Sequence, residues 1–172
     1  MTTSATTPAG FDLGEFTQRY VAAWNGCDTG AMAELLTEDI VWVDPAMPAP
    51  ARGIPAVQDF MRTSFQVFPD LRFSEPDPPH LTTDGNLISW AWTMEGTFRG
   101  PIDPPGFAPT GKRMKVGGVD LWRMREGRIH DYRAFYDMND VVRQLGILPE
   151  PGSRAEKMTA ALQRLQVRFQ RP

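Results

Sequence analysis

The sequence predicts a single α+β domain, because its helical and strand patterns fall into separate runs. Two helical patterns open the chain and a third follows one short strand, after which long alternating segments succeed one another across tight turns. Strands and helices therefore do not alternate as a parallel sheet requires. The 172 residues are enough for one sizeable core and too few for two full-sized domains.

The first part of the chain is predicted to be mainly helical. Asp12 and Glu15 have the spacing of a capping box, and an aromatic stripe follows at helical intervals until the Asn25-Gly26 stop signal. Asp28 is the predicted cap of a second, short helix. The β-branched segment 40–43 predicts a strand, and a third helix is expected to run from Pro55 to Phe68.

The second part of the chain is predicted to be a meander of strands, which closes with an amphipathic helix. We expect strands over 71–81, 87–98, 114–124 and 128–136, with turns at Asp84-Gly85-Asn86 and Arg125-Glu126-Gly127 and a proline-rich loop over 100–112. Ser153 and Glu156 form another capping box, and an apolar stripe follows them to the end of the chain. We therefore divide the chain into a flexible tail (1–10), the domain (11–148), and a linker with the terminal helix (149–172).

Charge and composition exclude several classes of function. The net charge is −3 and no segment is dense in lysine and arginine, so nucleic acid is not an expected partner. No run of about 18 apolar residues exists, and the amino terminus lacks the pattern of a signal peptide, so we expect a soluble, cytoplasmic protein that does not bind membranes. Cys27 is the only cysteine, and His80 and His130 do not have ligand spacing, so we expect no metal and no cofactor.

Several short motifs in a fixed order carry a resemblance to a known family. They are the strand end Asp44-Pro45, the helix end Phe68-Pro69-Asp70, the loop 109–112, the turn 126–129 and the segment 143–146. From Phe11 to Leu148 the chain resembles the SnoaL-like polyketide cyclases, a branch of the nuclear-transport-factor-2-like superfamily that also includes ketosteroid isomerase and limonene epoxide hydrolase. The resemblance implies a cone-shaped, curved mixed sheet wrapped around the amino-terminal helices, with a deep apolar pocket inside.

The chain departs from this family at the positions that carry its chemistry. In the cyclases an aspartate on the last strand is the acid/base of an aldol closure, and a histidine lies on the preceding strand. The corresponding residues here are Ala134 and Asp120. The water-activating residues of the epoxide hydrolase are also replaced: Trp42, Asp44, Trp92, Met94 and again Ala134 stand at those positions.

Asp120 and Asp44 are the candidate catalytic residues. Strand alternation places Asp120 on the same face as Trp122, and a carboxyl among aromatic rings is desolvated, which raises its pKa and makes it a better base. The alternative for Asp120 is a structural carboxylate that accepts a backbone hydrogen bond or pairs with Arg133. Asp44 precedes proline at a strand end and can equally be a turn cap. Two carboxylates in one cavity would titrate at different pH and supply an acid and a base.

The remaining candidates are residues that would line the pocket and bind the substrate. The tyrosines could donate hydrogen bonds to a developing enolate, the tryptophans could stack on a flat polycyclic ligand, and a loop phenylalanine could serve as a lid. Packing in the core is the alternative for every one of these aromatic side chains. The predicted substrate-binding set is Trp42, Trp90, Trp92, Met94, Phe107, Trp122, Tyr132, Ala134 and Tyr136.

These residues favour a cofactor-independent enzyme that cyclises, isomerises or dehydrates a hydrophobic, polyketide-like or polycyclic carbonyl compound by acid/base chemistry. Because of Ala134, a pocket protein that binds such a compound without reaction is the alternative, and an epoxide or ester hydrolase with a rebuilt water site is a third. We also expect a homodimer, because Val119, Leu121, Ile129 and Phe135 form an apolar patch on the opposite sheet face. The terminal helix could cover that patch instead.

Overall fold

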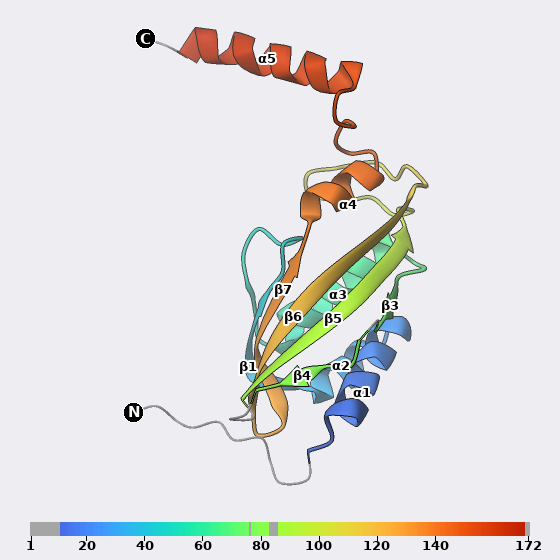
Figure 1. Cartoon of the computed structure of the whole chain (residues 1–172), viewed down its shortest axis with the longest axis vertical. Coiled ribbons are helices and arrows are strands. Elements are labelled where there is room, and N and C mark those ends of the chain that lie inside the picture. Colours follow the sequence, from blue (N-terminus) through green and yellow to red (C-terminus); the bar gives the residue numbers. More distant parts are fainter. Residues whose placement is uncertain (1–10, 76, 83–85, 171–172) are drawn as a thin grey trace.

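The computed structural model describes residues 11–75, 77–82 and 86–170 and has the expected α+β architecture (Figure 1). The predicted flexible tail, 1–10, and part of the turn at 84–86 lie outside the described residues. In chain order the elements are α1 (Leu13–Asn25), α2 (Thr29–Glu34), β1 (Leu36–Val43), β2 (Ala51–Arg52), α3 (Ile54–Val67), β3 (Arg72–Ser74), β4 (His80–Leu81), β5 (Leu87–Thr97), β6 (Arg113–Arg125), β7 (Arg128–Tyr136), α4 (Met138–Gln144) and α5 (Arg154–Gln170).

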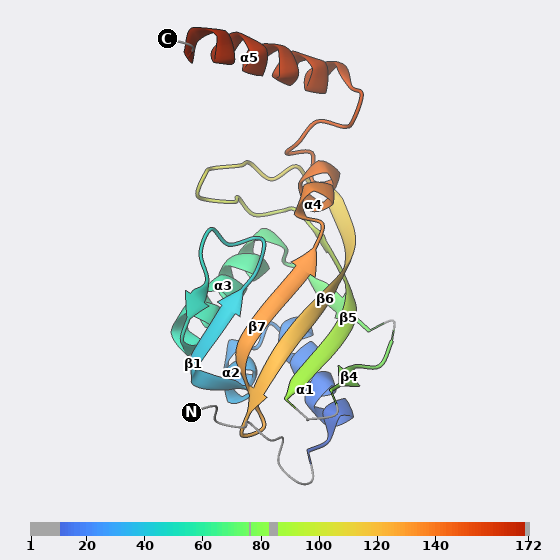
Figure 2. The ribbon, with the colours of Figure 1, turned by 60° about the vertical axis from the view of Figure 1, so that its left-hand side comes forward.

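The described strands form one curved, mixed sheet. Its order is β2-β1-β7-β6-β5-β3, with β4 also paired to β5. β1 and β7 run parallel and every other pair is antiparallel. Helices α1, α2 and α3 pack on the concave face, as Figure 2 shows. The inward-facing side chains of three long strands, β5, β6 and β7, therefore meet the helices in one core.

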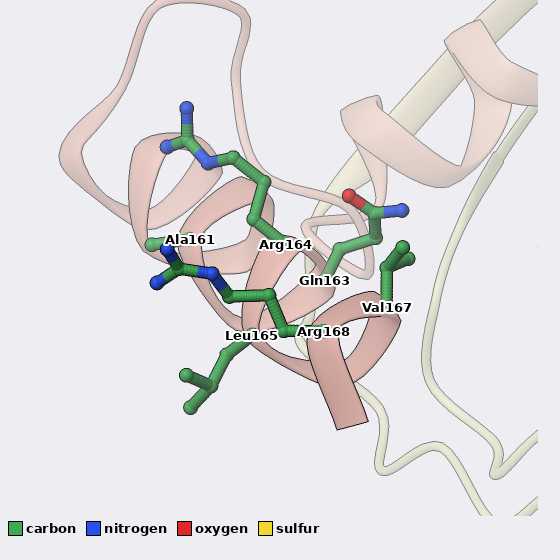
Figure 3. Close-up of a pocket in the computed structure, with 6 residues that line it drawn as sticks. All are labelled: Ala161, Gln163, Arg164, Leu165, Val167 and Arg168. Atoms are coloured by element: carbon green, nitrogen blue, oxygen red, sulfur yellow. The ribbon is translucent and has the colours of Figure 1, made fainter. Parts of the chain in front are cut away.

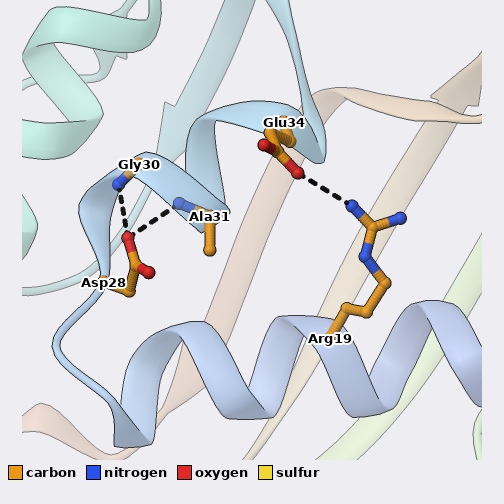
Figure 4. Close-up of polar contacts among 5 residues, drawn as sticks. All are labelled: Arg19, Asp28, Gly30, Ala31 and Glu34. Carbon is orange, nitrogen blue, oxygen red and sulfur yellow. Dashed lines mark hydrogen bonds and ion pairs between the residues drawn. The ribbon is translucent and has the colours of Figure 1, made fainter.

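Local signals explain why the amino-terminal helices begin where they do. The carboxylate of Asp12 accepts a hydrogen bond from Glu15 N. That of Asp28 accepts two, from Gly30 N and Ala31 N, as Figure 4 shows. Side-chain oxygens at these positions satisfy N–H groups that have no partner within the helix. The aromatic stripe of α1 then faces the sheet, where Phe16, Tyr20 and Trp24 are buried.

The interior is filled by aromatic rings rather than by aliphatic side chains alone. Tyr20 lies with its ring centroid 4.6 Å from that of Trp122 and 5.3 Å from that of Trp90. Trp42 stacks on Tyr132 at 3.5 Å with nearly parallel planes. Such pairs contribute roughly 0.5–1.5 kcal/mol beyond the burial of their area. The first helix is thereby fixed against the middle of the sheet.

Three differences between the structure and the sequence expectations have a clear physical reason. The predicted strand 71–81 is two short strands, because prolines at 78 and 79 cannot donate hydrogen bonds to the sheet. Helix α4 was not expected; it is capped by Asp137 and is too short to show a helical period. Ile129 is fully buried, not part of the outer patch, because a bulge at His130 shifts the alternation of β7 by one residue.

The terminal helix α5 stands apart from the rest of the chain. It follows a short connection after α4 and projects beyond the end of the sheet in both views (Figures 1 and 2). Its large apolar side chains are all exposed. Of the helices in the described part of the chain, none has the length and apolar character needed to cross a bilayer.

Candidate active site

Asp120 lies at the centre of the candidate site. It is on β6, points into the concave face and has no solvent exposure. Its Oδ1 accepts a hydrogen bond of 2.7 Å from the indole Nε1 of Trp92, and its Oδ2 accepts one of 3.3 Å from the Tyr20 hydroxyl. Burial raises the pKa of this carboxyl to about 7, against the opposing effect of the Trp92 hydrogen bond. Asp120 is therefore poised to take up or release a proton near neutral pH.

Trp92 can reach Asp120 because the neighbouring strand carries a glycine. Gly118 pairs with Trp92 across β5 and β6, two residues before Asp120 on the same face. A Cβ atom at Gly118 would lie only 2.4 Å from Cζ2 and 2.5 Å from Cη2 of the Trp92 ring. The six-membered ring of the indole therefore lies over Gly118, and the indole N–H donates to the carboxylate of Asp120.

Two buried tyrosines enclose Asp120 from the other sides. Tyr20 comes from α1, and Tyr132 comes from β7 and is stacked on Trp42. Burial and the charge of Asp120 raise the pKa of both hydroxyls well above its usual value. Both side chains therefore stay protonated and act as hydrogen-bond donors or acceptors rather than as bases.

A second polar pair lies at the carboxyl ends of β1 and β7. The hydroxyl of Tyr136 donates a hydrogen bond of 2.8 Å to Oδ1 of Asp44, which also accepts one from Ala46 N. Burial raises the pKa of the Asp44 carboxyl, and these hydrogen bonds oppose the rise. Asp44 is thus both a turn cap, as the alternative interpretation held, and a partly buried carboxyl beside the interior.

Trp92 lies between Asp120 and the Asp44–Tyr136 pair and contacts residues of both. It donates to Asp120 on one side, and its ring contacts that of Tyr136 edge-to-face at 5.6 Å on the other. The negative charge of Asp44 also raises the pKa of Asp120. The structure therefore brings both predicted carboxylates to one interior, with Trp92 and Tyr136 between them.

The predicted substrate-binding residues fall into two groups. Trp42, Trp90 and Trp122 are fully buried and pack against Tyr132 and Tyr20. Ala134 is also buried and pairs with Asp120 across the strands. Trp92, Met94 and Tyr136 lie toward the outer end of the site, which is the end at the carboxyl ends of β1 and β7. Met94 and Tyr136 are partly exposed there. Access for a ligand is therefore expected at the outer end, and contact with the inner tryptophans stays a prediction.

The proline-rich loop lies at this same outer end. Its backbone is fixed to the end of α3 through Arg99 N and Gly100 N, which both donate to Val67 O, and to α4 through Thr110, whose hydroxyl donates to Leu145 O. Phe107 is exposed and pairs with Ile102 through backbone hydrogen bonds. The loop therefore lies beside the ends of α3 and α4, and its action as a lid stays a prediction.

Two hollows on the described surface lie away from this interior. One lies at the other end of the sheet, where Arg125 pairs with Asp39 and holds the pKa of that carboxyl down to about 2. The other is a groove along α5 itself, lined by Ala161, Gln163, Arg164, Leu165, Val167 and Arg168 (Figure 3). Among the described residues, no group of three histidine, cysteine, aspartate or glutamate side chains comes together to hold a metal ion.

Comparison with known proteins gives the family of this fold. The sequence profile of the SnoaL-like polyketide cyclases matches residues 15–145. The chain belongs to the SnoaL-like polyketide cyclase family. A comparison with curated proteins gave no match.

Solved structures support the same fold. TsrD from Streptomyces laurentii shares 25% identity with a TM-score of 0.65, over 78% of this chain and 94% of that chain. IdmH, a candidate polyketide cyclase from Streptomyces antibioticus, shares 23% identity with a TM-score of 0.64, over 77% of this chain and 96% of that chain. AclR, a candidate hydroxylase from Streptomyces galilaeus, shares 21% identity with a TM-score of 0.66, over 94% of this chain and 100% of that chain.

Two residues of the site were not singled out by the sequence reasoning. Tyr20 was recognised only as part of the inner stripe of α1, although it hydrogen-bonds a carboxylate 100 positions away. Gly118 carried no chemical signal, and its role depends on the tryptophan that lies across it. A glycine inside a strand pattern does indicate close approach of another group, and that signal could have identified it.

Proposed function

We propose that this SnoaL-like protein is a cofactor-independent acid/base enzyme that acts on a hydrophobic, polyketide-like carbonyl compound, with Asp120 as the base. The observation that carries this proposal is the register of β6 and β7: Asp120 pairs directly with Ala134. Ala134 stands at the position that the family resemblance assigns to the catalytic aspartate. Cross-strand neighbours have Cβ atoms about 4.5–5.5 Å apart, so Asp120 supplies a carboxyl in the same layer of the interior.

The proposed reaction begins with proton abstraction. Ionised Asp120 removes a proton from a carbon beside a carbonyl group, which leaves an enolate whose oxygen carries the negative charge. The hydroxyl of Tyr136, which here donates to Asp44, would turn to the substrate and donate to that oxygen instead. The enolate carbon then attacks a second carbonyl of the same molecule or is reprotonated at another carbon, and Asp120 returns the proton. Cyclisation and isomerisation thus share the first step.

Burial sets the conditions for this chemistry. Asp120 is sealed by Trp92 and Tyr20, so a substrate has to enter past Asp44 and Tyr136 and displace the Trp92 ring. Loss of the Trp92 hydrogen bond on displacement would raise the pKa of Asp120 and increase its affinity for a proton. The carboxylate would therefore become a stronger base when the substrate is in place.

Proton exchange tests the first step without knowledge of the natural substrate. Small cyclic and polycyclic diketones are incubated with the protein in D2O, and incorporation of deuterium beside the carbonyl is followed by NMR. Asp120→Asn should lower the protein-dependent rate on the order of 10²- to 10⁴-fold while the variant still binds the diketone. Asp131→Asn is the matched control, because Asp131 pairs with Arg133 and lies outside the site. Equal rates in the wild type and Asp120→Asn would overturn the proposal.

A non-catalytic binding protein is the second candidate, and Ala134 together with the tight inner packing favours it. A protein of this kind would bind polycyclic carbonyl compounds and quench tryptophan fluorescence, yet would not accelerate exchange. Asp120→Asn would then leave the affinity for the ligand unchanged, and the ligand would remain chemically unaltered with either protein. Binding without exchange in the wild type would select this function over the enzyme.

A further inference from the structure

Helix α5 is a regular helix that the body of its own chain does not stabilise. Its apolar side chains are largely in water: Met158, Leu162, Leu165 and Phe169 are 65%, 61%, 50% and 82% exposed. An isolated helix of 17 residues is marginally stable in water, because most helical stability in proteins comes from packing of an apolar face. The described part of the chain therefore leaves the apolar face of α5 without a covering surface.

The spacing of the apolar residues indicates what fits against them. Ala155, Met158, Leu162, Leu165 and Phe169 are separated by three, four, three and four residues, which is the a/d repeat of a coiled coil. This pattern makes a narrow seam along one side of the helix, whereas a helix that packs on a globular core has a broader apolar face. A second helix with the same seam is the matching partner.

The polar residues of α5 argue against a membrane as the partner. On a helix with 3.6 residues per turn, Lys157, Arg164 and Arg168 all fall on one side of the seam. The opposite side carries Thr159, Gln163 and Gln166. A helix that lies in a lipid surface is rich in lysine and arginine across its polar face, because anionic headgroups surround it on both sides. The one-sided distribution fits a protein contact better.

The connection to the body holds α5 away from its own sheet. The chain is fixed up to Leu148, whose N–H donates to Val142 O in α4. Pro149 and Pro151 follow within the next three residues, and prolines favour an extended connection. In both views α5 stands clear of the sheet (Figures 1 and 2). The seam is thus presented to another molecule.

We propose that α5 pairs with the α5 of a second copy and joins two chains through a short coiled coil. The four large side chains expose roughly 500 Å² per helix, so the pair would bury about 1,000 Å², at the low end of specific interfaces. A reversible dimer is expected from an area of this size. Residues 154–172 carry net +4, so two paired helices repel each other electrostatically, which also keeps the dimer reversible.

Oligomeric state of the full chain tests the proposal, measured by sedimentation equilibrium across the micromolar range. The wild type should change from 19.3 kDa toward twice that mass as its concentration rises, and its helical circular dichroism should rise in parallel. Leu162→Glu should remain monomeric at every concentration. Gln163→Glu is the matched control, since it makes a similar change on the adjacent residue outside the seam and should still dimerise.

Three results would overturn the proposal. The first is a monomer at all concentrations in the wild type. The second is a dimer that survives Leu162→Glu but is lost in Phe135→Glu, which would place the interface on the outer sheet face around Val119 and Phe135. The third is a monomer that binds anionic lipid vesicles through Leu162. Near-ultraviolet circular dichroism of each variant reports whether the body, from which α5 stands apart (Figures 1 and 2), is still folded.

Discussion

Substitution of Gly118 by alanine should disturb the proton affinity of Asp120 without touching its carboxyl group. The added Cβ would lie 2.4 Å from Cζ2 of Trp92 and 2.9 Å from the carbonyl oxygen of Phe135. An ordinary carbon contact is about 3.5–4.0 Å, so the indole has to move by about 1 Å. A hydrogen bond of 2.7 Å to Asp120 would then be stretched beyond bonding distance.

The size of the effect follows from the bond that is lost. A hydrogen bond to a charged group contributes about 1.5–3 kcal/mol, which corresponds to about one to two pKa units. Because this bond stabilises the ionised form, its loss should raise the pKa of Asp120 further above 7. Overpacking should also lower the free energy of unfolding by about 1–3 kcal/mol.

Titration of the Asp120 carboxyl by 13C NMR is the direct assay. Gly117→Ala is the matched control, because a Cβ there meets nothing nearer than the Trp92 carbonyl oxygen at 3.8 Å, and its Asp120 should titrate as in the wild type. Trp92→Phe removes the donor without crowding and should raise the pKa in the same direction as Gly118→Ala. An unchanged titration in both Gly118→Ala and Trp92→Phe would refute the reasoning.

Further predictions concern pH, the outer pair and the loop. The folded pKa of Asp120, about 7, exceeds the unfolded value of about 3.9, so the contribution of Asp120 to stability should be greatest below pH 4, should fall by a few kcal/mol up to pH 7 and should then level off. Calorimetry should show this fall as a difference between the wild type and Asp120→Asn, and a difference that does not change with pH would contradict the raised pKa. Tyr136→Phe removes a hydrogen bond that lowers the pKa of Asp44, so this pKa should rise in an NMR titration. Deuterium exchange should slow about 10²- to 10³-fold if Tyr136 donates to the enolate oxygen, and unchanged exchange would exclude Tyr136 from the mechanism. Phe107→Ala should weaken diketone binding measured by tryptophan quenching, and unchanged affinity would make the loop a connector only.

The sequence predicted the elements well where short-range signals define them. The caps Asp12, Asp28 and Ser153 are where helices begin, and the run 128–136 coincides with β7. The prediction failed where a single extra residue changes which side chains of a strand face inward. Because of the bulge at His130, the residues of β7 before it face the opposite side from the one that simple alternation predicts. No local sequence pattern indicates this bulge.

The site was harder to predict than the fold, because alternation identifies which residues face inward but not what they meet there. Asp120 was placed correctly on the inner face, and so were the tryptophans around it. An inward tryptophan that lines a cavity and one that fills it have the same sequence pattern. Whether the interior is open depends on long-range contacts, such as that of Tyr20 with Trp90 and Trp122. Only the three-dimensional arrangement supplies these contacts.

Moving the carboxyl group from β6 to β7 tests whether a base at either position of the Asp120–Ala134 pair can support proton exchange. Asp120→Ala/Ala134→Asp keeps one carboxyl in the same cross-strand pair and moves it to β7, where the family resemblance places its aspartate. Ala134 is also buried, so the transferred carboxyl should have a raised pKa for the same reason as Asp120. The double variant should therefore recover part of the deuterium exchange that the Asp120→Ala variant loses. Recovery would be incomplete, since the Trp92 indole and the Tyr20 hydroxyl are directed at the β6 position. A double variant that folds and binds diketones but exchanges no faster than Asp120→Ala would contradict the idea that Asp120 replaces the family's base within one shared layer.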